Sequence, residues 1–189
     1  VSRFEPGPHA LRRSVRVLLF AWLVAAAGAA AHANWTASGT VNYQDREFDQ
    51  TGFTGVQPPL AARFVDVEVV DAGNGSVIGS GATNGVGAFS FTVTDANTRN
   101  IYLRALTRST KTTTLFIKVT NVANSPYAIA TATINGHTAT TNVNFGTLVA
   151  AIGAGGEAFN LYDQAVYGSD YLAFVQGARP NSSHPLTVV

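Results

Sequence analysis

Cysteine and methionine are both absent from the 189 residues. Without cysteine, the chain can form no disulfide, thiolate zinc site or cysteine nucleophile. Charged residues are scarce at 12%, whereas hydrophobic residues make up 46%, a composition typical of a folded protein rather than a disordered one. The length corresponds to one domain with appendages. Position 1 is Val, which a non-ATG start codon or a fragment would explain.

Pairs of catalytic or metal-binding side chains are also missing. The chain has four histidines, which are His9, His32, His137 and His184. No two of them have the i, i+4 spacing of the zinc-binding H-E-x-x-H helix. Ser182 and Ser183 lie within two residues of His184, so neither can easily face it as a nucleophile, and no G-x-S-x-G elbow exists. We therefore expect no catalytic, cofactor-binding or metal-binding residues and no enzymatic activity in this chain.

The first 33 residues have the organisation of a secretory signal peptide. Four arginines and one glutamate precede an uncharged apolar run from Val17 to Ala30, which ends in the cleavage pattern Ala31-His32-Ala33. The run is shorter than the roughly 20 residues that span a bilayer as a helix. We expect a signal helix, cleavage after Ala33, and export to the cell surface or the extracellular space, with no other membrane segment. An uncleaved membrane anchor is the alternative.

Most of the apparent basicity belongs to this segment. Residues 1–33 hold four of the 12 basic residues and one of the 11 acidic residues, so residues 34–189 have 8 basic and 10 acidic residues and a net charge of −2. No basic stripe remains, which argues against nucleic acid as a partner.

Short alternating apolar segments separated by turns extend from Trp35 to about Val149. Such spacing predicts an all-β sandwich of seven to eight strands. The eight candidate strands are 35–43, 63–71, 76–82, 88–93, 101–107, 113–119, 127–134 and 137–145. Gln44 to Leu60 is expected to be a long loop, and Asn135-Gly136 a two-residue type I′ hairpin turn that leaves His137 pointing to solvent. A strand carrying Lys111 and Lys118 would serve as a guarded sheet edge.

The acidic residues of this region are expected to face water. In the strand 63–71, Val65, Val67 and Val69 would point inward and Asp66 and Glu68 outward, because strict alternation indicates a half-buried strand. Asp66, Glu68 and Asp71 would then form a solvated polar face, as would Asp45, Glu47 and Asp49 in the long loop. A calcium site formed by the loop trio is the alternative.

Four aromatic residues near the start of this region have two possible roles. We expect Trp35 and Tyr43 to lie in the core, and Phe48 and Phe53 to hold the long loop in place. Alternatively, the four line a surface that binds sugar or peptide.

The periodicity changes after the glycine-rich break at 153–156. Residues 157–176 have apolar side chains at a spacing of three to four residues, which predicts an amphipathic helix. Its apolar stripe is expected to contain Leu161, Tyr162, Ala165, Val166, Leu172, Ala173 and Val175. Gly177 would end the helix, and Gly168 would mark a kink or a close contact. Residues 184–189 resemble the start of a strand, so we expect the chain to continue beyond Val189.

Several motifs in residues 35–107 match a known pattern. They are the opening Gly39-Thr40-Val41, the apolar strand around Val65 to Val69, the segment from Thr83-Asn84 to Phe89-Ser90-Phe91, and Tyr102-Leu103-Arg104-Ala105. Together they resemble the carboxypeptidase regulatory-like domain, although that family has Asp where Asn84 stands. The resemblance implies a transthyretin-like, immunoglobulin-type β-sandwich.

The helix beginning at Glu157-Ala158-Phe159-Asn160 is similar to the segment that precedes the catalytic domain in some secreted bacterial zinc metallopeptidases. The resemblance implies a non-catalytic accessory domain at the N-terminal side of such an enzyme, with the downstream domain as its partner. Two alternatives remain. One is a stand-alone module that binds a surface protein or glycan, and the other is an adhesion or pilus subunit that uses strand addition.

The expected organisation has four parts. Residues 1–33 are the signal peptide, 34–149 the sandwich, 150–178 a linker and helix, and 179–189 the start of a further segment. Neither the ligand nor the oligomeric state follows from the sequence.

Overall fold

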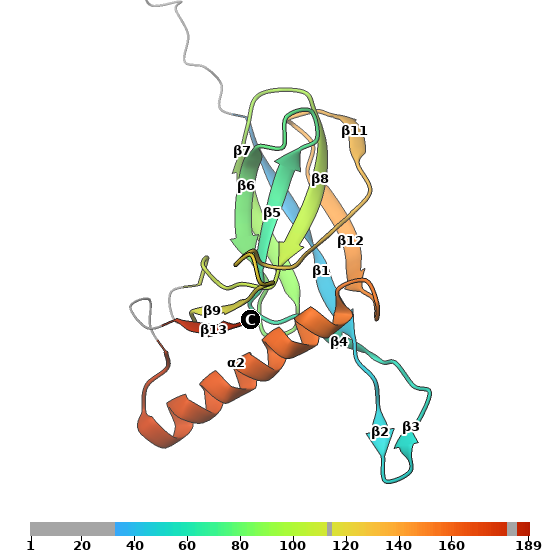
Figure 1. The fold of residues 1–189 in the computed structure, drawn as a ribbon. Coiled ribbons are helices and arrows are strands. Elements are labelled where there is room, and N and C mark those ends of the chain that lie inside the picture. The colour runs from blue at the N-terminus through green and yellow to red at the C-terminus, as the bar shows by residue number, and fades with distance from the viewer. Residues whose placement is uncertain (1–32, 113–114, 181–184) are drawn as a thin grey trace, which may run out of the picture. The chain divides into compact units, whose positions relative to one another are not determined.

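A computed structural model describes residues 33–112, 115–180 and 185–189 (Figure 1). The predicted signal helix therefore lies outside the described residues, as do Ser182, Ser183 and His184. The described part consists mainly of strands, with one helix, α2 (Gly156–Gln176), near its C-terminal end. The all-β sandwich with a C-terminal helix is thus confirmed. No helix in this part of the chain has the length and apolar character needed to cross a bilayer.

The first sheet has β1 (Asn34–Gln44) at its centre. On one side β1 pairs in parallel with β12 (Val143–Ala150). On the other side it pairs antiparallel with β7 (Ala88–Thr94) along its first half and with β4 (Pro59–Ala61) at its end. A side chain at Gly39 would clash, because its Cβ would lie 2.7 Å from the carbonyl oxygen of Gly146 and 2.8 Å from the Phe89 ring.

The second sheet has the order β6 (Val77–Ala82), β5 (Asp66–Asp71), β8 (Arg99–Leu106). On the side away from β5, β8 pairs with two short strands, β10 (Ala128–Ala130) and β11 (Ile134–His137). All the neighbouring strands in this sheet run antiparallel.

Two pairs of short strands lie outside the sheets. β2 (Phe48–Asp49) and β3 (Gly52–Phe53) form a hairpin within the predicted long loop. β9 (Ile117–Val119) pairs in parallel with β13 (Leu186–Val188), in the region predicted to begin a strand. Lys118 therefore lies on a strand that β13 covers rather than on a guarded edge.

The core lies between the inward faces of the two sheets and continues under the first half of α2. Burying a Val, Leu, Ile or Phe side chain stabilises the fold by about 1.5–3 kcal/mol relative to leaving it exposed. The largest fully buried side chains are Trp35, Val41, Tyr43, Val65, Val67, Val69, Val70, Ile101, Leu103, Ile117, Phe159 and Tyr162. The placement of Trp35 and Tyr43 in the core is confirmed.

The expected Asn135-Gly136 turn is wrong. Both residues lie inside β11, which pairs with β8 across a register shift between Ile134 and His137. Gly136 does have a positive φ of 64°, the feature that makes Asn-Gly a turn signal. Here that conformation produces an irregularity in a strand instead of reversing the chain.

The predicted solvated face of β5 is also wrong, because Asp66 is 0% exposed and Glu68 is 5% exposed. The alternation is correct, but the outer face of β5 is covered by charged partners. Arg108 Nε donates to Asp66 over 2.9 Å and Arg108 Nη2 to Glu68 over 2.7 Å, while Arg104 on β8 pairs with Glu68. The amide of Thr110 also donates to Asp66 over 2.8 Å. A buried carboxylate requires such partners.

His137 does not point to solvent. The side chain is buried, with its ring centroid 4.3 Å from that of Trp35. Its Nε2 lies 2.8 Å from the carbonyl oxygen of Thr141. A turn in which the Thr141 amide donates to the carbonyl oxygen of Thr138 over 3.1 Å then leads into β12.

Candidate functional site

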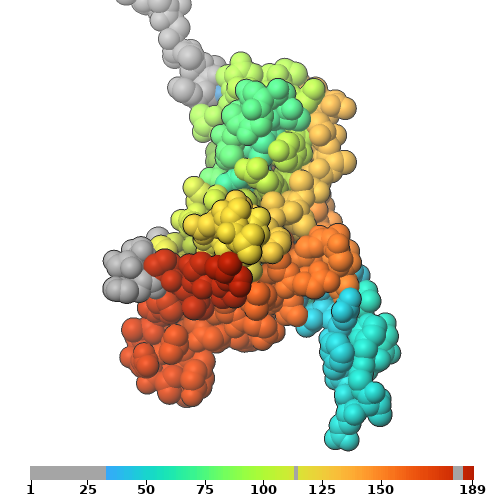
Figure 2. Space-filling model, in the orientation of Figure 1, coloured from blue at the N-terminus to red at the C-terminus, as the bar shows by residue number. Residues whose placement is uncertain are grey.

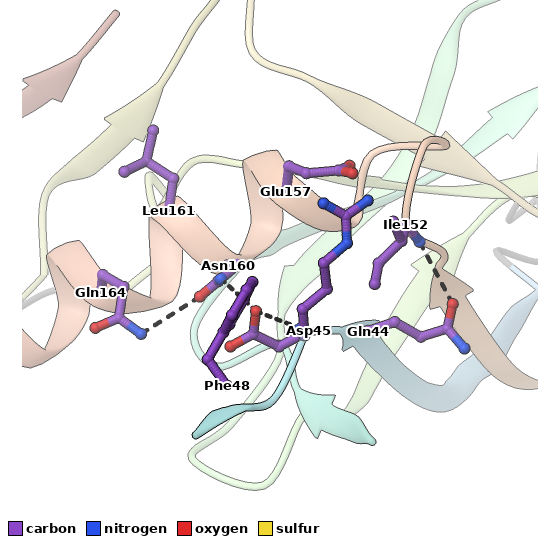
Figure 3. A pocket seen from close by; sticks show the side chains of 9 residues that line it. Gln44, Asp45, Phe48, Ile152, Glu157, Asn160, Leu161 and Gln164 are labelled. Atoms are coloured by element: carbon purple, nitrogen blue, oxygen red, sulfur yellow. Dashed lines mark hydrogen bonds between the residues drawn. The ribbon is translucent and has the colours of Figure 1, made fainter. Parts of the chain in front are cut away.

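A cleft of about 440 Å³ lies between the end of β1, the hairpin β2–β3 and the first half of α2 (Figure 3). In the space-filling view the hairpin, in cyan, projects from the sandwich beside the orange helix (Figure 2). The polar lining residues are Gln44, Asp45, Arg46, Glu157, Asn160 and Gln164, and the apolar ones are Phe48, Ile152 and Leu161.

The helix wall of the cleft begins at a glycine pair. Gly155 has a positive φ of 105°, and a Cβ on Gly156 would lie 2.9 Å from the backbone of residues 150 and 151. Only glycine lets the chain turn this closely against the end of β12. Both carboxylate oxygens of Glu157 then accept from the amide of Gly153, over 2.9 and 3.1 Å, which stabilises the first turn of α2.

The same helix is anchored to the sandwich by a buried carboxylate. Asp163, 4% exposed, accepts from Tyr43 Oη over 3.0 Å and from Arg63 Nε over 2.7 Å. Burial, followed by the negative charge of Asp163, raises the pKa of Tyr43 well above its ordinary value, so the phenol keeps the proton that it donates. Tyr162 Oη donates to the carbonyl oxygen of Phe64 over 3.0 Å. These bonds fix the helix wall.

The hairpin wall is tied to the helix at its base. Asn160 Nδ2 donates to Asp45 Oδ1 over 2.7 Å, and the amide of Ile152 donates to Gln44 Oε1 over 3.4 Å. Gln164 Nε2 donates in turn to Asn160 Oδ1 over 3.3 Å. Figure 3 shows the labelled side chains of Gln164, Asn160, Asp45 and Gln44 beside the cleft, with these hydrogen bonds as dashed lines.

Two aromatic rings are displayed on the hairpin. Phe48 is 67% exposed and Phe53 is 46% exposed, with 5.6 Å between their ring centroids. The Arg46 guanidinium lies 6.0 Å from the centroid of Phe53. The expectation that these two rings hold the loop against the core is therefore wrong, since they contact each other and leave a face of Phe48 toward the cleft (Figure 3).

The cleft contains charges of both signs. Asp45 and Glu157 contribute carboxylates and Arg46 a guanidinium. The Glu157 backbone amide, the Gly153 amide and the nearby Arg46 charge lower the pKa of Glu157 below its ordinary value. Glu157 is therefore ionised near neutral pH, and these three side chains together carry a net charge of −1.

The second half of α2 exposes large apolar side chains to solvent. Its exposed aromatic and aliphatic side chains are Tyr167 (57%), Tyr171 (65%), Phe174 (87%) and Val175 (54%). They lie at i, i+4, i+7 and i+8, so they share one face. The predicted apolar stripe is only partly correct, since Tyr162 and Val166 are buried but Leu161 and Val175 are exposed.

The predicted metal-site alternative receives no geometric support. Asp45 is engaged by Asn160, while Asp49 accepts from the amide and hydroxyl of Thr51 within the hairpin. No group of three His, Asp or Glu side chains suited to a metal ion occurs among the described residues.

Sequence reasoning considered Asp45 and Phe48 but missed their neighbours in the cleft. Asn160 and Gln164 have the spacing of one helix face, with Glu157 and Leu161. That spacing could have identified these four residues as neighbours on one face of the helix. Nothing in the local sequence shows that this face lies opposite a hairpin more than 100 residues earlier in the chain.

The chain matches no protein-family model and no curated protein. Among solved structures, a 9R-lipoxygenase from Cyanothece PCC8801 is 20% identical over 62% of this chain, with a TM-score of 0.34. The chain covers 16% of that lipoxygenase. A likeness at this level indicates neither the fold nor the function of this chain.

Proposed function

We propose that residues 34–178 form a non-catalytic accessory domain of an exported protein, and that the second half of α2 docks onto an apolar surface of a neighbouring protein domain. The domain is of the immunoglobulin or transthyretin type, similar to carboxypeptidase regulatory-like domains. A secreted zinc peptidase is the proposed context, with the domain at its N-terminal side.

The observation that carries this proposal is the contrast between the two halves of α2. The first half is anchored by Asp163, Tyr162 and Phe159, all buried. The second half exposes Tyr171 at 65% and Phe174 at 87%. Contiguous exposed aromatic side chains often mark protein interaction sites, and aromatic residues are enriched at the centres of such interfaces. An apolar partner surface would remove these side chains from water.

The absence of cysteine makes a direct test possible. Phe174→Cys introduces a single thiol on the exposed face of the helix. Val122→Cys, at a position 98% exposed, is the matched control away from α2. We expect maleimide labelling at position 174 to be at least tenfold slower in the protein produced from the complete coding sequence than in the fragment 33–189. Labelling at position 122 should be equal in both.

Equal labelling at position 174 in the two proteins would contradict docking through α2. The coding sequence after residue 189 tests the peptidase context separately. A following domain with H-E-x-x-H supports that context, whereas an immediate stop codon removes it.

A further inference from the structure

We propose that the cleft between the hairpin β2–β3 and α2 binds a neutral oligosaccharide. Phe48 would stack on a sugar ring, and the side chains of Gln44, Asn160 and Gln164 would bond to its hydroxyl groups. This site is separate from the docking face of α2, whose exposed residues begin at Tyr167.

The dimensions of the cleft suit a small ligand. A volume of about 440 Å³ falls in the range of roughly 300–1,000 Å³ found for ligand pockets. Its walls come from three elements, and hydrogen bonds from Asn160 to Asp45 and from Ile152 to Gln44 join them. The site is therefore formed before a ligand arrives, which lowers the entropic cost of binding.

The net charge of the cleft selects against anionic ligands, because an anion would meet the carboxylates of Asp45 and Glu157. A neutral ligand with many hydroxyl groups avoids this repulsion. Each hydroxyl can donate one hydrogen bond and accept others, so it can bond to carboxylate, amide and guanidinium groups alike.

The cleft retains unused hydrogen-bonding groups for such a ligand. Asp45 Oδ2 and the Arg46 guanidinium form no hydrogen bond with another described residue, while Asp45 Oδ1 accepts from Asn160. Gln164 uses Nε2 to reach Asn160, which leaves its carbonyl oxygen free within the described structure. The side chains of Asp45, Asn160 and Gln164 lie beside one another along the cleft (Figure 3).

The exposure of Phe48 gives the stacking surface. Its ring is 67% exposed and faces the cleft opposite Asn160 and Gln164 (Figure 3). The face of an aromatic ring is electronegative, so it attracts the weakly positive C–H groups on the apolar face of a pyranose. Stacking would remove apolar surface of both partners from water.

The test uses four neutral hexasaccharides as probes: maltohexaose, cellohexaose, xylohexaose and N-acetylchitohexaose. Titration calorimetry on residues 33–189 should detect binding of at least one with a Kd at or below about 1 mM. Phe48→Ala should weaken that binding at least tenfold, and Gln164→Ala at least threefold. Hexagalacturonate, a charged probe, should bind at least tenfold more weakly than the best neutral one.

Val122→Ala is the matched control, because it truncates a side chain that is 98% exposed and lies outside both the cleft and α2. It should leave the Kd unchanged. Failure of all four neutral probes to bind at about 5 mM would overturn the proposal. Equal binding by the Phe48→Ala variant, with its thermal unfolding unchanged, would overturn it as well. Neither result bears on docking through α2, which the labelling at position 174 decides.

Discussion

Asp163 shows how one side chain can determine the position of an element. It accepts from Tyr43 and Arg63, and its side chain is 5% exposed whereas that of Arg63 is 16% exposed. We expect Asp163→Asn to lower the free energy of unfolding by about 2–3 kcal/mol, because it removes the closer and buried of the two carboxylates that pair with Arg63 and leaves only Asp170, 3.7 Å away. Urea denaturation provides the measurement.

Asp170→Asn is the control for this change. Asp170 also pairs with Arg63 and Arg179, but its side chain is 37% exposed, and exposed pairs contribute about 0–1 kcal/mol. A loss as large as that of the Asp163 variant would show that burial is not what makes the Asp163 pair important.

Arg99 joins two aspartates into an acid-sensitive cluster. Hydrogen bonds from the Gly73 amide and then from Arg99 lower the pKa of Asp71. Burial opposes the effect at Asp95, but hydrogen bonds from Arg99 and Asn97 outweigh it, so the pKa of Asp95 is lowered as well. Both groups therefore stabilise the fold at pH values above the ordinary aspartate pKa of 3.8, and this stabilisation is lost as the pH falls through their lowered values.

We expect Arg99→Gln to reduce this acid sensitivity. Urea midpoints measured at pH 6 and at about pH 3 should differ less in the variant than in the wild type. An unchanged difference between the two pH values would exclude Arg99 as a source of the pH dependence.

At the residue scale, the sequence predicted which side chains alternate but not always what they face. Val67 and Val69 point inward as expected, and Asp66 points the other way. The error lay in assigning that second face to water. Its covering group Arg108 is 42 positions further along the chain, and no local pattern encodes such a distance.

The helix α2 was predicted with nearly correct boundaries. Its start differs by one residue, and Gly177 ends it with a φ of 68°, donating its amide to the carbonyl oxygen of Ala173. The periodicity and the terminal glycine are local signals, so they could be recognised in the sequence. The sandwich buries only the part of α2 that lies against it. No local pattern in the sequence shows where that contact ends.

Gly168 is a point where α2 can be stabilised. The expected close contact is not present, since no heavy atom outside the nearby helix backbone lies within 4 Å of where a Cβ would be. Gly168→Ala should therefore raise the free energy of unfolding by about 0.5–1 kcal/mol, because alanine loses less backbone entropy in a helix. Thermal unfolding followed by circular dichroism tests this.

Gly81 in β6 is a glycine at which alanine should destabilise the fold. A Cβ on Gly81 would lie 2.5 Å from a ring carbon of Phe91, so Gly81→Ala should cost about 1–3 kcal/mol through overpacking. If both alanine variants change stability in the same direction, local space is not what distinguishes these two glycines.

At the scale of the whole molecule, the described unit should be independent of the residues before it. Residues Ala33–Val189 form one compact unit. We expect a protein starting at Ala33 to give a far-ultraviolet dichroism spectrum dominated by strands and to unfold in one cooperative urea transition. A helix-dominated spectrum, or a gradual transition, would contradict the sandwich.

The class of fold was predictable because alternation, turn residues and the change of period before residue 157 all indicate the same architecture. The candidate site was not predictable to the same extent. Phe48 and Asp45 could be recognised as unusual, but their partners Asn160 and Gln164 come from the opposite end of the domain. A cleft formed by distant segments becomes visible only when the sheets are assembled.

The parallel pairing of β1 with β12 also has a kinetic consequence. Thr36 bonds to Asn142 across 106 positions, so a ribosome adding about 5–20 residues per second completes the first strand roughly 5–20 s before its neighbour exists. Throughout that interval, the amide and carbonyl groups on the side of β1 that β12 will cover have no strand partner and can pair with another strand. The time during which β1 can pair with a wrong strand is therefore determined by the order of synthesis, and not by the stability of the folded protein.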